Sequence, residues 1–216
     1  MRYAIGMSPH TSDSLASLSG PVAGLLLAAG GGRRLGGRPK ALLTHRGRPL
    51  VERAVAALRA GGCDPVQVVL GAAAEEVRHR ADLSGCRVTE NPEWDTGMGS
   101  SLRAGLTALA ATGAADAAAA LVMLVDQPRV GAEAVARLVA AHRDGTALAA
   151  AAYHGERGHP VLIGRALWPE VMASATGDRG ARDFLRAHRE RLTPVECSDV
   201  AAPDDVDTPP DLRLLE

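Results

Sequence analysis

Hydrophobic and polar positions along the chain follow two alternating patterns. Short runs of Val, Leu and Ala predict β-strands at residues 22–28, 65–70, 86–90, 119–125, 147–153, 159–163 and 193–197. Longer segments with apolar residues three and four positions apart predict helices at residues 49–61, 73–80, 99–111, 131–143, 165–173 and 179–190. Because strands and helices alternate, we expect an α/β fold built from βαβ units around a largely parallel sheet.

The length of the chain sets the expected domain organisation. With 216 residues, the protein is long enough for one well-buried domain. Residues 22–216 carry the alternating pattern and are expected to form this domain. Residues 1–21 show neither a strand nor a helix pattern, and we expect a disordered N-terminal extension there.

Charge and composition exclude several classes of function. The formal net charge is −1, and the chain has only two tryptophans, two tyrosines and one phenylalanine. Non-specific nucleic-acid binding needs a positive field or stacking platforms, so it is not expected. No segment is apolar enough for a secretory signal or a membrane span. Three widely spaced cysteines form neither a CxxC pair nor a disulfide framework, which indicates a reducing cytoplasm.

A stretch rich in glycine and basic residues, "LLLAAGGGRRLGGRPKALL", follows the first predicted strand. It does not match a Walker A loop, because Lys40 lies between Pro39 and Ala41 instead of following a glycine and preceding a hydroxyl residue. It does not match a dinucleotide fingerprint, because Leu35 occupies the position of the last glycine. Two interpretations remain: a longer loop that wraps a triphosphate with its N–H groups, or a flexible glycine hinge.

Two carboxylates, one at the end of a predicted strand and one before a C-terminal turn of helix, suggest a metal site. Asp126 ends the apolar strand of "LVMLVDQP", and Asp207 lies in "PDDVDTPPDL". A triphosphate normally arrives with Mg²⁺, which accepts one or two protein carboxylates and keeps several waters. The structural alternatives are a strand-terminal turn for Asp126 and a helix cap for Asp207.

Together these segments resemble a known family. "LAAGGGRRLGGRPKALL" is similar to the LAAGxSxRMGxxK signature of MobA-like nucleotidyltransferases. The stretches "NPEWDTGMGSSLRAGL", "VDQP", "RGHPVLIG", "GDRGARDFL" and "DVDTP" resemble the molybdenum cofactor cytidylyltransferases within that family. The resemblance implies a Rossmann-like three-layer fold with a mostly parallel mixed sheet. It also implies Mg²⁺-dependent transfer of CMP from CTP to the phosphate of molybdopterin, with release of pyrophosphate and possible transient contact with molybdoenzyme maturation proteins.

The resemblance also assigns roles to individual residues. Backbone and side-chain contacts to the nucleotide are expected from Ala28, Ala29, Gly30, Gly32, Gly97, Ser100 and Ser101. Catalytic roles are expected for Arg34, Lys40 and Asp126, metal binding for Asp126 and Asp207, and acceptor binding or structural support for His159.

The sequence departs from the signature in three ways, and three alternatives to the assignment stay open. Gly32 and Leu35 replace the serine and methionine of the signature, and the spacing of "GGRPK" is that of guanylyl-transferring members. GTP is therefore an alternative to CTP, and another phosphorylated metabolite is an alternative acceptor. A non-catalytic nucleotide-binding module is the third possibility.

Overall fold

A seven-stranded mixed sheet forms the centre of the computed structural model, which describes residues 20–111, 117–143 and 146–216. The expected extension at residues 1–21 lies almost wholly outside the described residues. The strand order is β5-β4-β1-β6-β8-β7-β9, and only β8 runs antiparallel to its neighbours. The strands are β1 (Val22–Ala28), β4 (Val66–Leu70), β5 (Arg87–Glu90), β6 (Ala119–Leu124), β7 (Leu148–Tyr153), β8 (Glu156–Gly164) and β9 (Thr193–Glu196). The predicted mostly parallel mixed sheet is confirmed.

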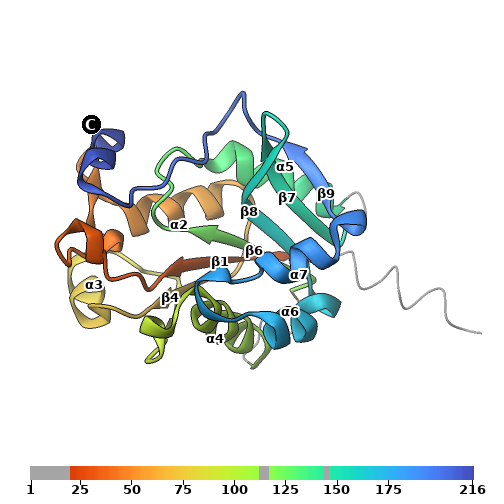
Figure 1. Ribbon diagram of the computed structural model, residues 1–216, viewed down its shortest axis with the longest axis horizontal. Coiled ribbons are helices and arrows are strands. Elements are labelled where there is room, and N and C mark those ends of the chain that lie inside the picture. The colour runs from red at the N-terminus through yellow and green to blue at the C-terminus, as the bar shows by residue number, and fades with distance from the viewer. Residues whose placement is uncertain (1–19, 112–116, 144–145) are drawn as a thin grey trace, which may run out of the picture.

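Helices cover both faces of the sheet, so the fold has three layers (Figure 1). One face packs against α2 (Leu50–Ala60) and α5 (Ala132–Arg143). The other face packs against α4 (Met98–Ala111), α6 (Trp168–Ser174) and α7 (Arg182–Ala187). Helix α3 (Ala74–Arg80) follows β4 and contributes Ala74 and Val77 to the same core as α2. The side chains of each strand alternate between the two resulting cores.

Helix α2 shows how the apolar pattern determines the packing. Its buried residues, three or four positions apart, form one stripe that faces the sheet: Leu50, Val51, Ala54, Val55 and Leu58. Gly61 ends the helix where α5 approaches closely, since a Cβ atom there would lie 2.3 Å from Val135. Any larger residue at position 61 would push the two helices apart.

Short elements account for the differences from the predicted pattern. The two-residue strands β2 (Thr44–His45) and β3 (Arg48–Pro49) form a hairpin that was not predicted, because they are too short to show a period. The predicted helix at 165–173 is divided into a 3-10 turn at Arg165–Leu167 and α6 at Trp168–Ser174. The predicted helix at 179–190 begins only at Arg182, because Gly180 has a φ of 51° just before α7. 3-10 turns connect the main elements, at Arg33–Leu35, Lys40–Leu42, Trp94–Thr96, Arg165–Leu167, Gly177–Arg179, Arg189–Arg191 and Pro209–Leu215.

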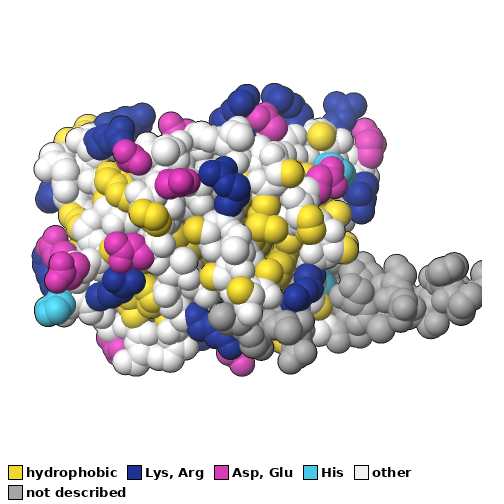
Figure 2. All heavy atoms as spheres, turned by 90° about the horizontal axis from the view of Figure 1, so that it is seen from below, with side chains coloured by type: hydrophobic (Ala, Val, Ile, Leu, Met, Phe, Trp, Pro, Cys, Tyr) yellow, Lys and Arg dark blue, Asp and Glu magenta, His cyan; other side chains and the backbone are white. Residues whose placement is uncertain are grey.

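The described residues carry mixed charges on one face, short helices and free cysteines. Basic and acidic side chains are interspersed over the face seen from below in Figure 2, so neither sign of charge dominates it. None of the described helices is both long and apolar enough to cross a bilayer. Cys63, Cys86 and Cys197 are free thiols, as the absence of a disulfide pattern predicts.

Candidate functional site

The glycine-rich loop after β1 has a fixed geometry that only glycine allows. Gly32 has a φ of 60°, and a Cβ atom there would lie 1.9 Å from the carbonyl oxygen of Arg38. The N–H groups of Leu35 and Gly37 donate to the carbonyl oxygen of Gly32 at 2.8 and 3.0 Å. At Gly30, by contrast, no atom lies within 4 Å of the Cβ position. The loop therefore closes on itself and leaves open space beside Gly30, which favours a ligand-wrapping loop over a hinge.

A cavity of about 440 Å³ lies against this loop. Its walls come from the segments that follow β1, β5 and β6 and from the C-terminal stretch around residue 207. Carboxyl ends of parallel strands meet at one edge of a sheet, which is where ligands bind in such folds. The predicted residues that line this cavity are Ala29, Gly30, Gly32, Arg34, Lys40, Gly97, Ser101, Asp126 and Asp207.

The start of α4 places Ser101 at the cavity and Ser100 in a buried network. Asn91 donates through Nδ2 to both serine hydroxyls, at 2.8 Å to Ser100 and 3.0 Å to Ser101. The Ser100 hydroxyl also lies 2.8 Å from the carbonyl oxygens of Glu93 and Gly97, to which it donates. The hydrogen-bonding capacity of Ser100 is thus used to hold the segment at residues 91–97 that leads into α4, the α4 entry loop. Ala28 is likewise buried, at the end of β1.

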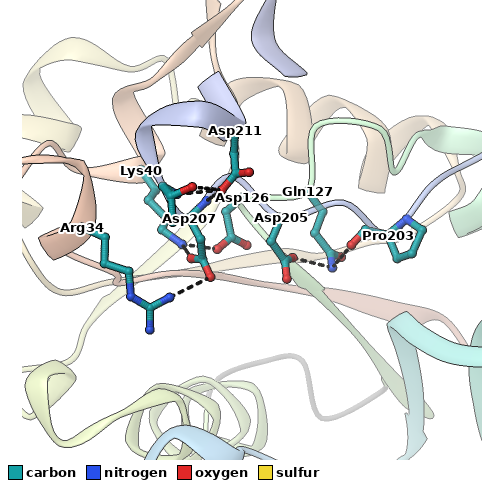
Figure 3. A network of polar contacts seen from close by, with 9 residues as sticks. Arg34, Lys40, Asp126, Gln127, Pro203, Asp205, Asp207 and Asp211 are labelled. Atoms are coloured by element: carbon teal, nitrogen blue, oxygen red, sulfur yellow. Dashed lines mark hydrogen bonds and ion pairs between the residues drawn. The ribbon is translucent and has the colours of Figure 1, made fainter. Parts of the chain in front are cut away.

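Lys40 joins two carboxylates that are far apart in the sequence. Its Nζ lies 2.6 Å from Oδ2 of Asp126 and also binds Oδ1 of Asp207 (Figure 3). Arg34 approaches Asp207 from the solvent side, with Nη1 at 3.4 Å from Oδ2. The predicted catalytic and metal-binding residues therefore meet at one point, with the ammonium group of Lys40 between the two predicted metal-binding carboxylates.

The pKa shifts in this cluster follow from burial and from neighbouring charges. Burial lowers the pKa of Lys40, but its Coulombic and hydrogen-bonding contacts with Asp126 and Asp207 outweigh that effect, and the net pKa is raised. Burial and the adjacent charge of Asp126 raise the pKa of Asp205. A cation is thus favoured among these three carboxylates.

The C-terminal segment is attached to the end of β6 by backbone and side-chain hydrogen bonds. The N–H of Val206 donates to the carbonyl oxygen of Asp126 at 2.9 Å. Gln127 donates through Nε2 to Oδ1 of Asp205 at 2.8 Å. Thr208, with Asp211, forms the capping box of the final 3-10 turn. Because Thr208 is the cap, the carboxylate of Asp207 is free to face Lys40.

Asp126 and Asp207 carry the type of oxygen ligand that Mg²⁺ prefers. Asp126 and Asp207 supply two hard oxygen donors, which is the number that Mg²⁺ usually takes from protein while keeping its waters. Within the described ranges no group of three or more His, Cys, Asp and Glu side chains has metal-binding geometry.

A second cavity, of about 320 Å³, adjoins the first and contains His159. The two cavities share Leu27, Met98, Leu124, Asp178 and Asp205. Burial lowers the pKa of His159 to about 4, so its imidazole is neutral near pH 7. The carbonyl oxygen of His159 accepts a hydrogen bond from Oη of Tyr153 at 2.6 Å.

Sequence comparison identifies the family. The sequence model of the MobA-like NTP transferase domain matches residues 24–192. The chain belongs to the MobA-like NTP transferase family. A relative from Paenarthrobacter nicotinovorans, named nicotine blue oxidoreductase, is 45% identical over 199 residues, which cover 87% of this chain and 92% of that protein.

Solved structures share the fold. The crystal structure of the Rv0371c homologue from Mycobacterium sp. strain JC1 has a TM-score of 0.76 at 34% identity, and the match covers 92% of this chain and 96% of that one. Rv0371c of Mycobacterium tuberculosis, solved as a complex with manganese, has a TM-score of 0.72 at 30% identity, with coverages of 90% and 97%. The Rossmann-like nucleotidyltransferase fold is thereby confirmed.

The structure explains one departure from the MobA-like signature and adds residues that were not predicted. A serine cannot replace Gly32 in this conformation, because its Cβ would collide with the carbonyl of Arg38. Residues not assigned to the site from sequence also line the two cavities, among them Trp94, Asp178, Asp205, Arg157 and Arg182. "PDDVD" and "GDRGAR" were the available signals, but neither indicates which side chains face a cavity.

Proposed function

We propose that this MobA-like protein transfers CMP from CTP to the phosphate of the molybdenum cofactor and releases pyrophosphate. The observation that carries the proposal is the meeting of Lys40 with Asp126 and Asp207 beside the glycine-rich loop. Three segments distant in sequence bring two cations and two carboxylates to one cavity. That combination suits a metal-bound triphosphate better than it suits a neutral ligand.

The chain's own residues bind and orient the nucleotide. Open backbone beside Gly30 lets the loop approach the phosphates, and Arg34 and Lys40 balance their charge. Asp126 and Asp207 would hold Mg²⁺, which when bound would supply Lewis-acid polarisation of the phosphate groups. Ser101 lies at the same cavity, within the part that the α4 entry loop builds.

The reaction is an in-line displacement that needs no covalent enzyme intermediate. An oxygen of the acceptor phosphate forms a bond to the α-phosphorus while the bond from the α-phosphorus to the bridging oxygen breaks. Pyrophosphate leaves with the electron pair, and Arg34 and Lys40 stabilise its charge. Alignment and charge neutralisation therefore supply most of the acceleration.

Substitution of the two central residues tests this mechanism. Losing one charge-stabilising contact costs about 2 to 4 kcal/mol of transition-state stabilisation. We therefore expect Lys40→Ala and Asp126→Ala each to lower turnover of CTP at least about a hundredfold. The matched control is Arg129→Ala, whose guanidinium pairs with Asp204 at 3.3 Å on the exposed surface and lines neither cavity. Near-normal turnover by both folded variants would contradict the assignment.

The nucleotide and the acceptor are tested directly. The protein is incubated with Mg²⁺, each of the four NTPs in turn and either the molybdenum cofactor or another phosphorylated metabolite as acceptor, and pyrophosphate release is measured. Release with CTP alone supports the proposal. Release only with GTP supports a guanylyltransferase, and release only with another phosphorylated metabolite replaces the proposed acceptor.

A second candidate function is oxidoreduction, which the 45% identity to the relative named nicotine blue oxidoreductase favours. Such a reaction needs a reductant, for which a nicotinamide dinucleotide is the natural class. The loop does not have the dinucleotide spacing, since Leu35 stands in place of the last glycine. Oxidation of NADH or NADPH in the presence of nicotine blue, with no pyrophosphate release from any NTP, would favour this function over nucleotidyl transfer.

A further inference from the structure

The second cavity has an apolar floor and a basic rim. Its floor is formed by buried side chains of β1, β6, β8 and α4 that belong to the same core on one face of the sheet: Leu27, Leu102, Val122, Val161 and Ile163. Arg157 of β8 and Arg182 of α7 lie at its rim and are exposed. An apolar floor suits a flat or hydrophobic body, and a basic rim suits a negative group on that body.

The guanidinium groups of these two arginines differ from that of the third arginine of the cavity in their partners. Among the residues that the structure describes, neither Arg157 nor Arg182 forms an ion pair, whereas the third arginine of the cavity, Arg179, pairs with Asp183 at 3.1 Å. Both free arginines also contribute to lowering the pKa of His159, which places their charges close to the same imidazole. Two unpaired cations beside one apolar cavity favour an anionic ligand.

Charge is distributed unevenly between the two ends of this cavity. Asp178 and Asp205 line the part that is shared with the first cavity, the one beside the glycine-rich loop. Arg157 and Arg182 line the second cavity and do not line the first. A ligand that extends from Lys40 toward Arg182 therefore passes carboxylates first and meets unpaired guanidinium groups last.

We propose that Arg157 and Arg182 form a specificity subsite for a second negative group, at the end of the acceptor opposite its reacting phosphate. The body of such an acceptor lies on the apolar floor, and its two negative ends point to Lys40 and to the arginine pair. This inference rests on the proposed function for the identity of the acceptor. The binding preference itself, an apolar body with an anionic group, follows from the cavity alone.

A pair of dyes tests the subsite without any turnover. The probe 8-anilinonaphthalene-1-sulfonate has an aromatic body and one sulfonate, and N-phenyl-1-naphthylamine has the same body without the charge. Fluorescence titration should show that the double variant R157M/R182M binds the sulfonate dye about tenfold or more weakly than the unmodified protein. The affinity for the neutral dye should change less than about twofold, because the apolar floor is unaltered.

The matched control is Arg186→Met on the same helix. Arg186 is exposed, pairs with Asp183 at 2.8 Å and does not line the cavity. Its substitution removes the same charge from α7 and should leave the affinity for both dyes unchanged. Circular dichroism and melting temperature confirm that each variant is folded. Unchanged sulfonate binding in R157M/R182M, or equal loss in R186M, would overturn the subsite.

Steady-state kinetics separates failure of the subsite from failure of the proposed function. If the protein transfers CMP, R157M/R182M should raise the KM for the acceptor about tenfold or more while the KM for CTP stays within about twofold. Transfer with an unchanged acceptor KM contradicts the subsite and keeps the function. Absence of any transfer, together with the expected dye results, contradicts the function and keeps the subsite.

Discussion

Replacing Lys40 by methionine removes the cation that lies between Asp126 and Asp207. The side chains of Lys40 and Asp126 are only 13% and 18% exposed, and that of Asp207 is 43% exposed. Methionine keeps the length of the apolar stem, so the variant chiefly loses charge and hydrogen bonds. The two carboxylates then face each other, with Asp205 nearby, and only the exposed guanidinium group of Arg34 still pairs with Asp207.

The expected cost lies between the values for buried and exposed ion pairs. Removing one partner costs about 3 to 5 kcal/mol in a fully buried pair and about 0 to 1 kcal/mol in an exposed one. Because one of the two carboxylates is nearly half exposed, we expect Lys40→Met to lower the free energy of unfolding by about 1 to 3 kcal/mol. For a chain of this size that corresponds to a fall in melting temperature of about 3 to 10 °C.

Magnesium should reverse part of this loss. In the variant, the carboxylates are available to a divalent cation, whereas in the unmodified protein Lys40 competes for them. Added Mg²⁺ should therefore raise the melting temperature of Lys40→Met more than that of the unmodified protein.

Differential scanning calorimetry at neutral pH, with and without Mg²⁺, measures these effects. The control is Arg78→Met, which breaks an exposed ion pair with Glu90 at 2.8 Å. It should change the free energy of unfolding by less than about 1 kcal/mol and should not respond to Mg²⁺. Equal melting shifts in the two variants, or an equal response to Mg²⁺, would refute the argument from burial and charge.

Two further predictions concern the loop and the second cavity. Gly32→Ala forces a Cβ to 1.9 Å from the carbonyl oxygen of Arg38 and should weaken CTP binding, measured by calorimetric titration, at least about tenfold. Gly36→Ala, with the same sign of φ but open space, should cost only about 1 kcal/mol of stability. The pKa of His159 is lowered to about 4, so the unfolded state binds its proton first and stability falls as the pH drops from 6.5 to 4. His159→Gln should reduce the loss of unfolding free energy between pH 6.5 and 4, measured by urea denaturation at each pH. A pH dependence equal to that of the unmodified protein would contradict this prediction.

Much of the fold follows from local pattern. The apolar run at 22–28 forms β1 with the predicted ends, because a strand buried on both faces consists of continuous hydrophobic residues. Helix α2 begins after Pro49 and ends before Gly61, where the sequence supplies its start and stop signals. The place of the glycine-rich loop also follows from the sequence, since Gly30, Arg34 and Gly36 match the glycine and arginine positions of the family signature.

Other features depend on contacts between distant segments and could not be predicted. Nothing near Lys40 indicates that its ammonium group lies between Asp126 and Asp207, because the C-terminal segment reaches β6 only through tertiary hydrogen bonds. The position of Arg182 beside β8 depends in the same way on how α7 packs against the sheet. Ser100 was predicted as a nucleotide contact, but its hydroxyl donates to backbone carbonyls of the α4 entry loop, and its role stays a prediction.

The arrangement of charges also bears on the order of binding in the proposed reaction. In the structure, Lys40 neutralises the carboxylates that would hold Mg²⁺, so an ion alone competes with an ammonium group. A triphosphate gives Lys40 a new anionic partner at the glycine-rich loop and leaves Asp126 and Asp207 to the metal. Binding of either the nucleotide or the metal thus raises the affinity for the other, which is positive coupling between them. A MobA-like site of this kind would bind the metal–nucleotide complex more readily than either component alone.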